Sequence, residues 1–298
     1  MFIENNIYRL FKLMSYNQEK TFAFLTNDDK DINNGKFVGG FIRNTNILSN
    51  GLYQKFKNIV FMDSSIYSSK RSQYFYDELE LNRSNTRMIK FEDELDLNDS
   101  VNLILDESLQ IPMKINKLMK YNSGNSFILT NSKKRAREIL KSLRDSDVYD
   151  ENVILIQDFI GNNDKIVKKI VNDSKNIIIG NNELMDLICQ KGKKINNLII
   201  DAFPLNEFDD VYLQAQYDLI NDQHGNPNDG LSIPLSILSI KDAIKSVIKA
   251  SNRNALIYFR DKEVIDGPYG NNLIDLLPNH IKPEYLEKRK IIEKFKKN

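Results

Sequence analysis

The stretch SFILTNSKKRAREIL, residues 126–140, determines how we interpret the fold of this chain. It opens with five residues that are mostly apolar, and the part after Ser132 places Ala136 and Ile139 on one helical face with basic residues on the other. A continuous apolar run is typical of a strand that is buried on both faces. A buried strand followed at once by an amphipathic helix predicts one unit of a parallel sheet that is covered by helices.

Similar apolar runs recur along the chain, and stretches with helical spacing lie between them. The runs cover residues 21–25, 58–62, 101–105, 126–130, 152–157, 176–180, 197–201 and 255–259. From residue 120 onwards, strands and helices alternate in the order that a doubly wound domain produces. The fold class that the sequence predicts is therefore α/β, with a doubly wound parallel sheet flanked by helices.

The composition bears on metal and redox sites. The chain has 298 residues, with 42 Lys and Arg against 41 Asp and Glu, one cysteine and two histidines. A lone Cys189 cannot form an internal disulfide, and with His224 and His280 it cannot complete a metal site of sulfur and imidazole ligands. Carboxylate pairs such as 209–210 could bind Mg²⁺, but pairs of this kind arise by chance in a chain with so many acidic residues. We therefore expect no metal site.

Charge and hydropathy bear on location and partners. The formal net charge of +1 gives no global attraction for nucleic acid, so any such binding must come from a local basic patch. No apolar run approaches the ~18 residues that a membrane span requires, and the first residues lack the apolar core of a signal peptide. We expect a cytoplasmic chain with no membrane partner.

The sequence holds no phosphate-binding loop of the GxxxxGK[ST] type, because its Gly-Lys pairs at 35–36 and 192–193 are not followed by Ser or Thr. Its densest basic cluster, residues 133–137, directly follows the strand expected at 126–130. This cluster begins a helix at the carboxyl edge of the sheet, where backbone amides and cationic side chains can both face an anion. A solvated helix face explains the same residues equally well.

Further segments follow in a fixed order. They are FKNIVFMDSSI (56–66), NIIIGNNELMDLIC (176–189), NNLIIDAFPLNEF (196–208), PLSILSIKDAIKSVIKASNRNALIYFRD (234–261) and YGNNLIDLLPNHI (269–281). In order and spacing, and with SFILTNSKKRAREIL between the first two, they resemble the C-terminal part of the DinG/XPD-type superfamily 2 DNA helicases. The resemblance implies a RecA-like (P-loop-NTPase-type) fold without a Walker A loop.

The resemblance assigns two groups of polar positions to DNA. In the family, a Ser-Ala-Thr-Leu motif couples ATP hydrolysis to DNA movement, and its first three positions correspond to Asp63, Ser64 and Ser65 here. The family's Thr-Ser pair, whose hydroxyl groups hold the DNA backbone, corresponds to Asn131 and Ser132. The resemblance thus implies that Asn131 and Ser132 bind nucleic acid, together with the neighbouring cations Lys133, Lys134 and Arg137.

Two further family segments are substituted here. Of the family's Gly-Thr-x-Ser-Phe-Trp-Glu-Gly-x-Asp segment the chain keeps Gly180, while Asp186 stands in place of the Glu. The family's Gln-Gly-x-Gly-Arg-x-x-Arg motif has arginines that reach the γ-phosphate; its Gln and two Arg positions hold Asp242, Ser246 and Lys249. We therefore expect no catalytic residue, and no productive binding of ATP or Mg²⁺ by this chain alone.

The resemblance also implies a domain division and a function. Residues 1–70 would be a helix and strands from the end of the first motor domain, and residues 71–298 a degenerate second motor domain. Apolar signatures are kept and catalytic ones are lost, which is typical of a pseudoenzyme. We expect a non-catalytic module that binds nucleic acid weakly, or docks onto a helicase or nuclease partner, in DNA repair or replication.

Two alternatives remain open at this point. The chain could be half of a split ATP-dependent DNA helicase, or an unrelated α/β enzyme that binds a nucleotide or metabolite. The partners that these interpretations predict are single-stranded DNA and a protein that carries the first helicase lobe or a nuclease.

Overall fold

The computed structural model describes residues 21–27, 35–41, 48–62, 76, 79–87, 89, 101–106, 113–130, 132–146, 148, 153–157, 162–172, 174–202, 211–251, 255–260, 267, 270 and 283–297. The chain divides into two compact units. Unit 1 consists of Met1–Ile66, Lys70–Ile89 and Phe208–Pro234, and unit 2 of Tyr67–Ser69, Lys90–Glu207 and Leu235–Asn298. The division into helicase domains at residue 70 stays a prediction.

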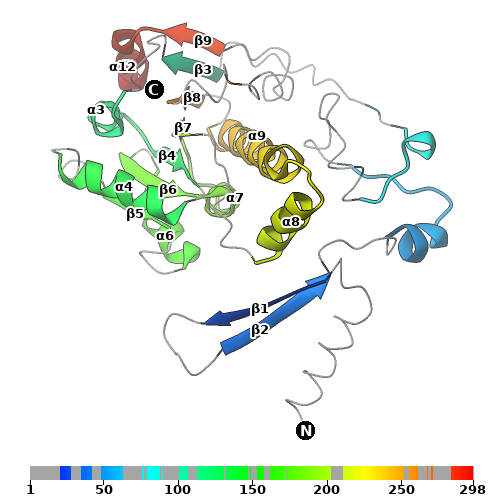
Figure 1. The fold of residues 1–298 in the computed structure, drawn as a ribbon. Helices are drawn as coiled ribbons and strands as arrows, with labels where there is room; N and C mark the ends of the chain where they lie inside the picture. The colour runs from blue at the N-terminus through cyan, green and yellow to red at the C-terminus, as the bar shows by residue number, and fades with distance from the viewer. Residues whose placement is uncertain are drawn as a thin grey trace. The chain divides into compact units, whose positions relative to one another are not determined.

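Within the described residues, unit 2 is built on a seven-stranded parallel sheet (Figure 1). From one edge to the other its strands are β5 (Val153–Ile156), β6 (Asn176–Gly180), β4 (Ser126–Leu129), β7 (Asn197–Ile200), β8 (Ala255–Phe259), β3 (Val101–Asp106) and β9 (Pro283–Leu286). The sequence-based prediction of a doubly wound parallel α/β sheet is confirmed, because the chain leaves β4 towards one edge and later returns to build the other.

Helices cover both faces of this sheet. They are α3 (Ile115–Met119), α4 (Lys133–Arg144), α6 (Asn163–Lys169), α7 (Asn182–Gln190), α9 (Ile233–Ala250) and α12 (Lys288–Lys297). Successive residues of β4, Phe127 and Ile128, are both fully buried although they point to opposite faces. That double burial is why the strands have continuous apolar sequences.

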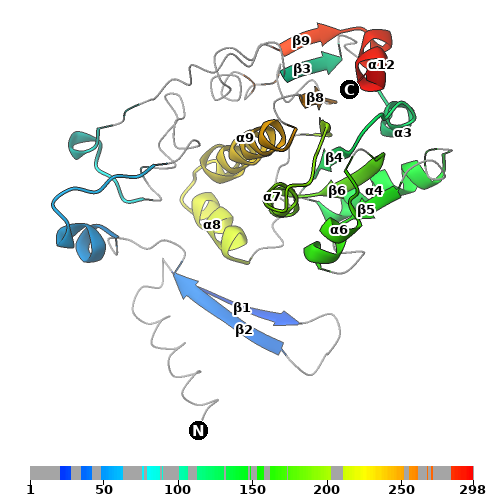
Figure 2. The same cartoon turned by 180° about the vertical axis from the view of Figure 1, so that it is seen from behind.

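One core cluster joins a single face of the sheet to α3, α4 and α12. From α4 it takes Ala136 and Ile139, two of the residues that the helical spacing predicts as the apolar face. The buried residues of α6, α7 and α9 lie outside this cluster. The two helical layers therefore pack on opposite faces of the sheet, with α3 between α4 and α12 in both views (Figures 1 and 2).

A network of buried amide side chains joins the amino ends of the central strands. Asn125, which is fully buried, donates through Nδ2 to the carbonyl oxygens of Val171 (3.1 Å) and Lys194 (3.0 Å). Its Oδ1 accepts from the backbone (3.2 Å) and side chain (2.8 Å) of Asn176, at the start of β6. These bonds give Asn125 a partner for each polar atom of its buried side chain, and they tie the start of β6 to the segments that precede β6 and β7.

The structure of residues 283–297 differs from what their sequence pattern predicts. The sequence suggests one terminal helix with Tyr285 among its apolar anchors, but residues 283–286 form the edge strand β9 and the helix begins at Lys288. Tyr285 is 44% exposed, so its assignment as an anchor is wrong, whereas Ile291 and Phe295 are buried as expected. Short edge strands such as β9 carry little periodicity for a pattern to detect.

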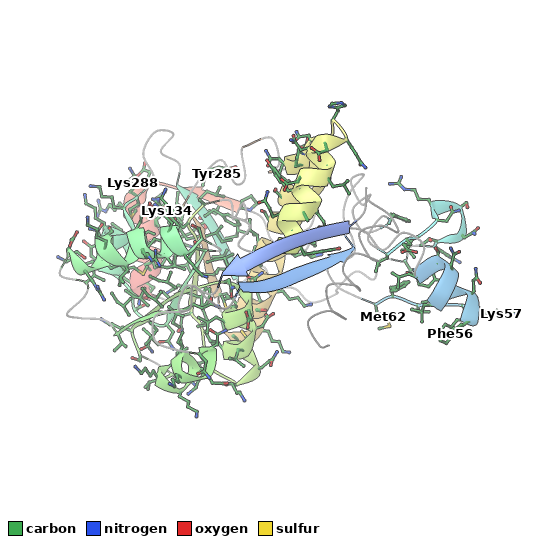
Figure 3. All side chains as sticks on the ribbon, turned by 60° about the horizontal axis from the view of Figure 1, so that its bottom comes forward. Phe56, Lys57, Met62, Lys134, Tyr285 and Lys288 are labelled. Carbon is green, nitrogen blue, oxygen red and sulfur yellow. The ribbon has the colours of Figure 1, made fainter. Side chains whose placement is uncertain are left out.

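In unit 1, β1 (Thr21–Asn27) pairs with β2 (Gly35–Phe41) in antiparallel register, and the described helices include α8 (Val211–Asp222). The strand expected at 58–62 is absent from the described structure. Those residues are irregular, with Val60 79% and Met62 89% exposed (Figure 3). That prediction is wrong because an apolar run becomes a strand only when another strand supplies hydrogen bonds, and no described residue pairs with this one.

Candidate functional site

The topology of the sheet marks one place where a ligand would bind. β4 leads through α4 towards β5 on one side, and its neighbour β7 leads towards β8 on the other side. The carboxyl ends of β4 and β7 therefore form a switch point, where open parallel sheets bind their ligands. The residues directly after these two strands define the candidate site.

The segment after β4 is fixed by local hydrogen bonds. The backbone NH of Thr130 donates to the carbonyl oxygen of Gly180 (2.9 Å), and that of Ser132 donates to Thr130 Oγ1 (3.3 Å). Ser132 then caps α4, because its Oγ accepts from the backbone NH of Arg135 at 3.2 Å. The helix begins here because Ser is a favoured cap and an amphipathic sequence follows it.

A buried carboxylate lies at the same edge and was missed by the sequence analysis. Asp201, directly after β7, has a side chain that is only 1% exposed. Its Oδ2 accepts from Arg135 Nε and its Oδ1 from Arg260 Nε, each at 2.5 Å. Asp201 thus ties the first turn of α4 to the end of β8, where Arg260 follows the strand.

These contacts change the role of Arg135 within the basic cluster. Its side chain also pairs with Glu138 at 2.9 Å. The hydrogen bond that Arg135 donates to Asp201 raises the pKa of Arg135, while partial burial opposes that change. Arg135 therefore positions α4 through two carboxylates. The sequence held one signal for this cluster: Asp201 and Arg260 are charged residues that directly follow two strands, β7 and β8, which are neighbours in the sheet.

Three cations predicted to bind nucleic acid lie on the exposed side of the first turns of α4. Lys133, Lys134 and Arg137 are all exposed, beside the cap residue Ser132, and Figure 3 shows Lys134. The positive end of the helix dipole and these side chains combine to favour an anion there. Asn131, like Asp63, Ser64 and Ser65, lies outside the described residues.

Substituted positions of two family segments come together where α7 contacts α9. Ser246 Oγ donates to Asp186 Oδ1 at 2.8 Å, and Cys189 Sγ donates to the carbonyl oxygen of Ser246 at 3.3 Å. Burial raises the pKa of Cys189 to about 11, the nearby Asp186 carboxylate adds to the rise, and Lys249 opposes it. Asp242 lies on the same helix, α9. Neither α7 nor α9 contains an arginine.

Gly180 ends β6 where the chain has no room for a side chain. A Cβ atom there would lie 2.8 Å from Gln157 Oε1, an atom that accepts from the backbone NH of Asn181 at 2.8 Å. Asn181 in turn caps α7 through its side chain. The retained glycine therefore lets Gln157 support the start of α7, which is a structural role.

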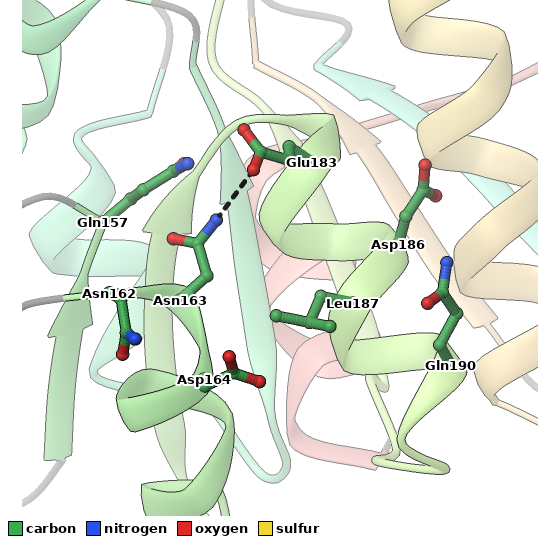
Figure 4. A pocket seen from close by; sticks show the side chains of 8 residues that line it. All are labelled: Gln157, Asn162, Asn163, Asp164, Glu183, Asp186, Leu187 and Gln190. Carbon is green, nitrogen blue, oxygen red and sulfur yellow. Dashed lines mark hydrogen bonds between the residues drawn. The ribbon is translucent and has the colours of Figure 1, made fainter.

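A pocket of about 620 Å³ lies beside the outer side of α7 (Figure 4). It is lined by Gln157, Asn162, Asn163, Asp164, Glu183, Asp186, Leu187 and Gln190, and a hydrogen bond of 3.5 Å joins Asn163 to Glu183. Its lining contains carboxylates and amides but no cation, so it would repel a phosphate group. Among the described residues, no three His, Cys, Asp or Glu side chains gather as a metal site would require.

The family model for the helicase C-terminal domain matches residues 115–280, more than half of the chain. The chain therefore belongs to the helicase C-terminal domain family. This match removes the interpretation as an α/β enzyme unrelated to helicases. None of the described helices is long and apolar enough to cross a membrane.

Curated relatives confirm the expected resemblance to DinG/XPD-type helicases. The chain is 20% identical over 171 residues to the ATP-dependent DNA helicase YoaA of Haemophilus influenzae and to that of Escherichia coli, a match that covers 57% of this chain and 26% of each relative. It is 21% identical over 118 residues to the 3'-5' exonuclease DinG of Bacillus subtilis, covering 40% of this chain and 13% of that protein. The chain thus spans about a quarter of the YoaA proteins.

A solved structure, "Structure of S. tokodaii Xpd4", is similar with a TM-score of 0.40 and 13% identity. That alignment covers 94% of this chain and 65% of the solved chain.

Proposed function

We propose that this chain is a non-catalytic helicase C-terminal lobe that binds single-stranded nucleic acid weakly through the first turn of α4. The observation that carries the proposal is the hydrogen bond between Ser246 and Asp186. Ser246 stands where the family that the sequence resembles has an arginine that reaches the γ-phosphate, and here it bonds across α7 and α9 to Asp186, which stands in place of a family Glu.

Phosphoryl transfer needs cations aimed at the charge that develops on the γ-phosphate. At the contact of α7 with α9, the chain offers the Asp186 carboxylate, the Ser246 hydroxyl, a thiol whose raised pKa keeps it neutral at pH 7, and the nearby cation Lys249. The carboxylate repels the phosphate, and neither helix has an arginine to bind it in the way that the family's two arginines do. We therefore assign no catalytic residue, and no productive binding of ATP or Mg²⁺, to this chain alone.

Binding to a phosphate backbone needs less chemistry than hydrolysis. Exposed cations beside the amides of a helix N-terminus suffice, and α4 has both in Lys133, Lys134 and Arg137. Because Asp201 and Glu138 already pair with Arg135, the remaining positive charge is modest. Binding should accordingly be weak, insensitive to sequence and strongly dependent on salt.

The setting of this activity is also part of the proposal. The curated relatives are named as a DNA helicase and an exonuclease, which supports a role on DNA. We propose DNA repair or replication in the cytoplasm as that role. A protein that carries a first helicase lobe or a nuclease is the partner that we expect. If such a partner supplied the missing ATP site, the two chains would form a split helicase, but the Ser246–Asp186 pair argues against that alternative.

The test compares two charge-matched double variants in single-strand binding. Lys133→Glu with Lys134→Glu should weaken binding of a fluorescent 20-nucleotide strand at ~50 mM salt by about tenfold or more, because repulsive charges replace attractive ones within a Debye length of the backbone. The control, Lys168→Glu with Lys169→Glu on α6, makes the same change of net charge elsewhere. The proposal fails if the parent does not bind at low salt, or if both variants lose equal affinity.

A further inference from the structure

The helical layer formed by α3, α4 and α12 is continuous. α3 packs against α4, and its C-terminal end meets α12, where Ser123 Oγ donates to the carbonyl oxygen of Phe295 at 2.7 Å. Lys296 lies over the ring of Tyr121, 4.7 Å from its centre. Shared core contacts hold the three helices against one face of the sheet. Both views show α3 between α4 and α12 (Figures 1 and 2). The outer sides of the three helices therefore form one surface within unit 2.

Positive charge is concentrated on this surface. α12 has six basic residues and one acidic residue, Glu293, and α4 likewise has six basic residues against Glu138. Three lysines in and beside α3 are exposed, with no acidic residue among them. Away from the α4 N-terminus, the exposed cations that define what we call the basic layer are Lys114, Lys117, Lys120, Lys141, Arg144, Lys288, Arg289, Lys290, Lys296 and Lys297.

The charge on unit 2 is uneven. α4 and α12 each have six basic residues against one acidic residue, whereas α6 and α9 of the opposite layer each have three lysines against one aspartate. The whole chain has a formal net charge of only +1. On the opposite layer, α7 contains Glu183 and Asp186 and no basic residue, and the neighbouring pocket is lined by carboxylates and amides. A polyanion that approaches unit 2 is therefore attracted to the basic layer and repelled from α7.

The basic layer is separate from the proposed single-strand site. α4 starts at the carboxyl edge of the sheet and spans 12 residues, so its two ends lie ~18 Å apart at 1.5 Å per residue. Lys133 and Lys134 are at the first end, and Lys141 and Arg144 at the other. Three adjacent helices, each ~10 Å across, make a surface on the order of 30 Å wide.

We propose that the basic layer binds the backbone of double-stranded nucleic acid. A duplex carries one charge per ~1.7 Å of its axis, so ~30 Å of duplex has on the order of 18 phosphates to face such a surface. Single-strand sites instead combine a groove with aromatic rings on which successive bases stack. Of the described aromatic side chains on and beside these helices, Phe295 is buried and Tyr121 lies beneath Lys296. Tyr285, exposed on the edge strand β9, is a single ring.

The experiment uses the full chain with three exposed lysines reversed: Lys117→Glu, Lys290→Glu and Lys297→Glu. The probe is a fluorescent 20-base-pair blunt duplex, titrated at several salt concentrations. We expect duplex affinity at ~50 mM salt to fall by about tenfold or more, and the slope of log affinity against log salt to decrease by about 3, for three lost phosphate contacts. Single-strand affinity should change by less than about threefold, because the α4 N-terminus is intact.

The control is a triple variant of equal charge on the opposite layer and its flank: Lys165→Glu, Lys168→Glu and Lys191→Glu. It should change duplex affinity by less than about threefold. The proposal is overturned if the parent does not bind duplex at low salt, if both triple variants weaken binding equally, or if the single strand loses as much affinity as the duplex. Displacement of the duplex by polyglutamate at equal charge would also overturn it, in favour of an acidic protein partner. The Lys133 and Lys134 variant reports on single-strand binding separately.

Discussion

Replacing Asp201 with Asn should destabilise unit 2, because this carboxylate is the buried counterion of two arginines. The substitution preserves shape and leaves one acceptor oxygen, but it removes the charge that Arg135 and Arg260 share. Asp201 is 1% exposed, Arg260 is 16% exposed and each arginine bonds it at 2.5 Å. The expected loss of stability is therefore the cost of removing one partner from a buried ion pair.

The magnitude follows from the exposure of each arginine. Removing one partner of a buried ion pair costs about 3–5 kcal/mol. Arg135 is 37% exposed and keeps Glu138 as a partner, so solvent screening reduces its share. We therefore take the lower end, and expect Asp201→Asn to reduce the free energy of unfolding by about 3 kcal/mol.

The assay is urea unfolding followed by far-ultraviolet circular dichroism. Its control is Glu138→Gln, which removes an exposed partner of the same arginine and should cost about 0.5 kcal/mol or less. A free energy of unfolding for Asp201→Asn within about 1 kcal/mol of the parent would refute the reasoning, as would an equal loss in the control.

Two further predictions concern other buried groups. Asn125→Ala removes four hydrogen bonds: the carbonyl oxygen of Lys194 loses its side-chain donor, and that of Val171 keeps only Asn176 Nδ2 at 3.2 Å. Urea unfolding should therefore show a loss of about 3 kcal/mol, against less than about 1 kcal/mol for Asn116→Ala on α3. Because burial raises the pKa of Cys189 from 9.0 to about 11, its alkylation by iodoacetamide should keep accelerating up to about pH 11. The stability that the neutral thiol contributes should be lost as pH rises from 9 to 11. A rate of alkylation that levels off near pH 9 would contradict this prediction.

Much of the sheet could be predicted from the sequence, because its central strands are buried on both faces and so have continuous apolar runs. The run at 58–62 has the same pattern but is not a strand, since a pattern records burial potential and not the presence of a neighbouring strand. β9 shows the converse case. Its four residues, PEYL, are too few to show an alternation of apolar and polar residues. They form a strand because they pair with the edge of β3.

The candidate site could be predicted only in part. The helix start at Ser132 is a local feature, and the structure places its cap and cations as the pattern indicates. The Asp201 cluster depends on residues 59 and 66 positions apart in sequence, which only the strand order brings together. Likewise, no local signal pairs Ser246 with Asp186, 60 residues away on another helix.

ATP turnover by the purified chain, with and without single-stranded DNA, tests the central claim of a non-catalytic lobe most directly. An arginine finger alone is worth ~10³–10⁵ in rate, so we expect no turnover above background. The double variant Asp242→Gln with Ser246→Arg should remain equally inactive, because one restored arginine does not supply a phosphate-binding loop. DNA-stimulated turnover above about 0.1 per second in the parent, abolished by Lys249→Ala, would contradict the account.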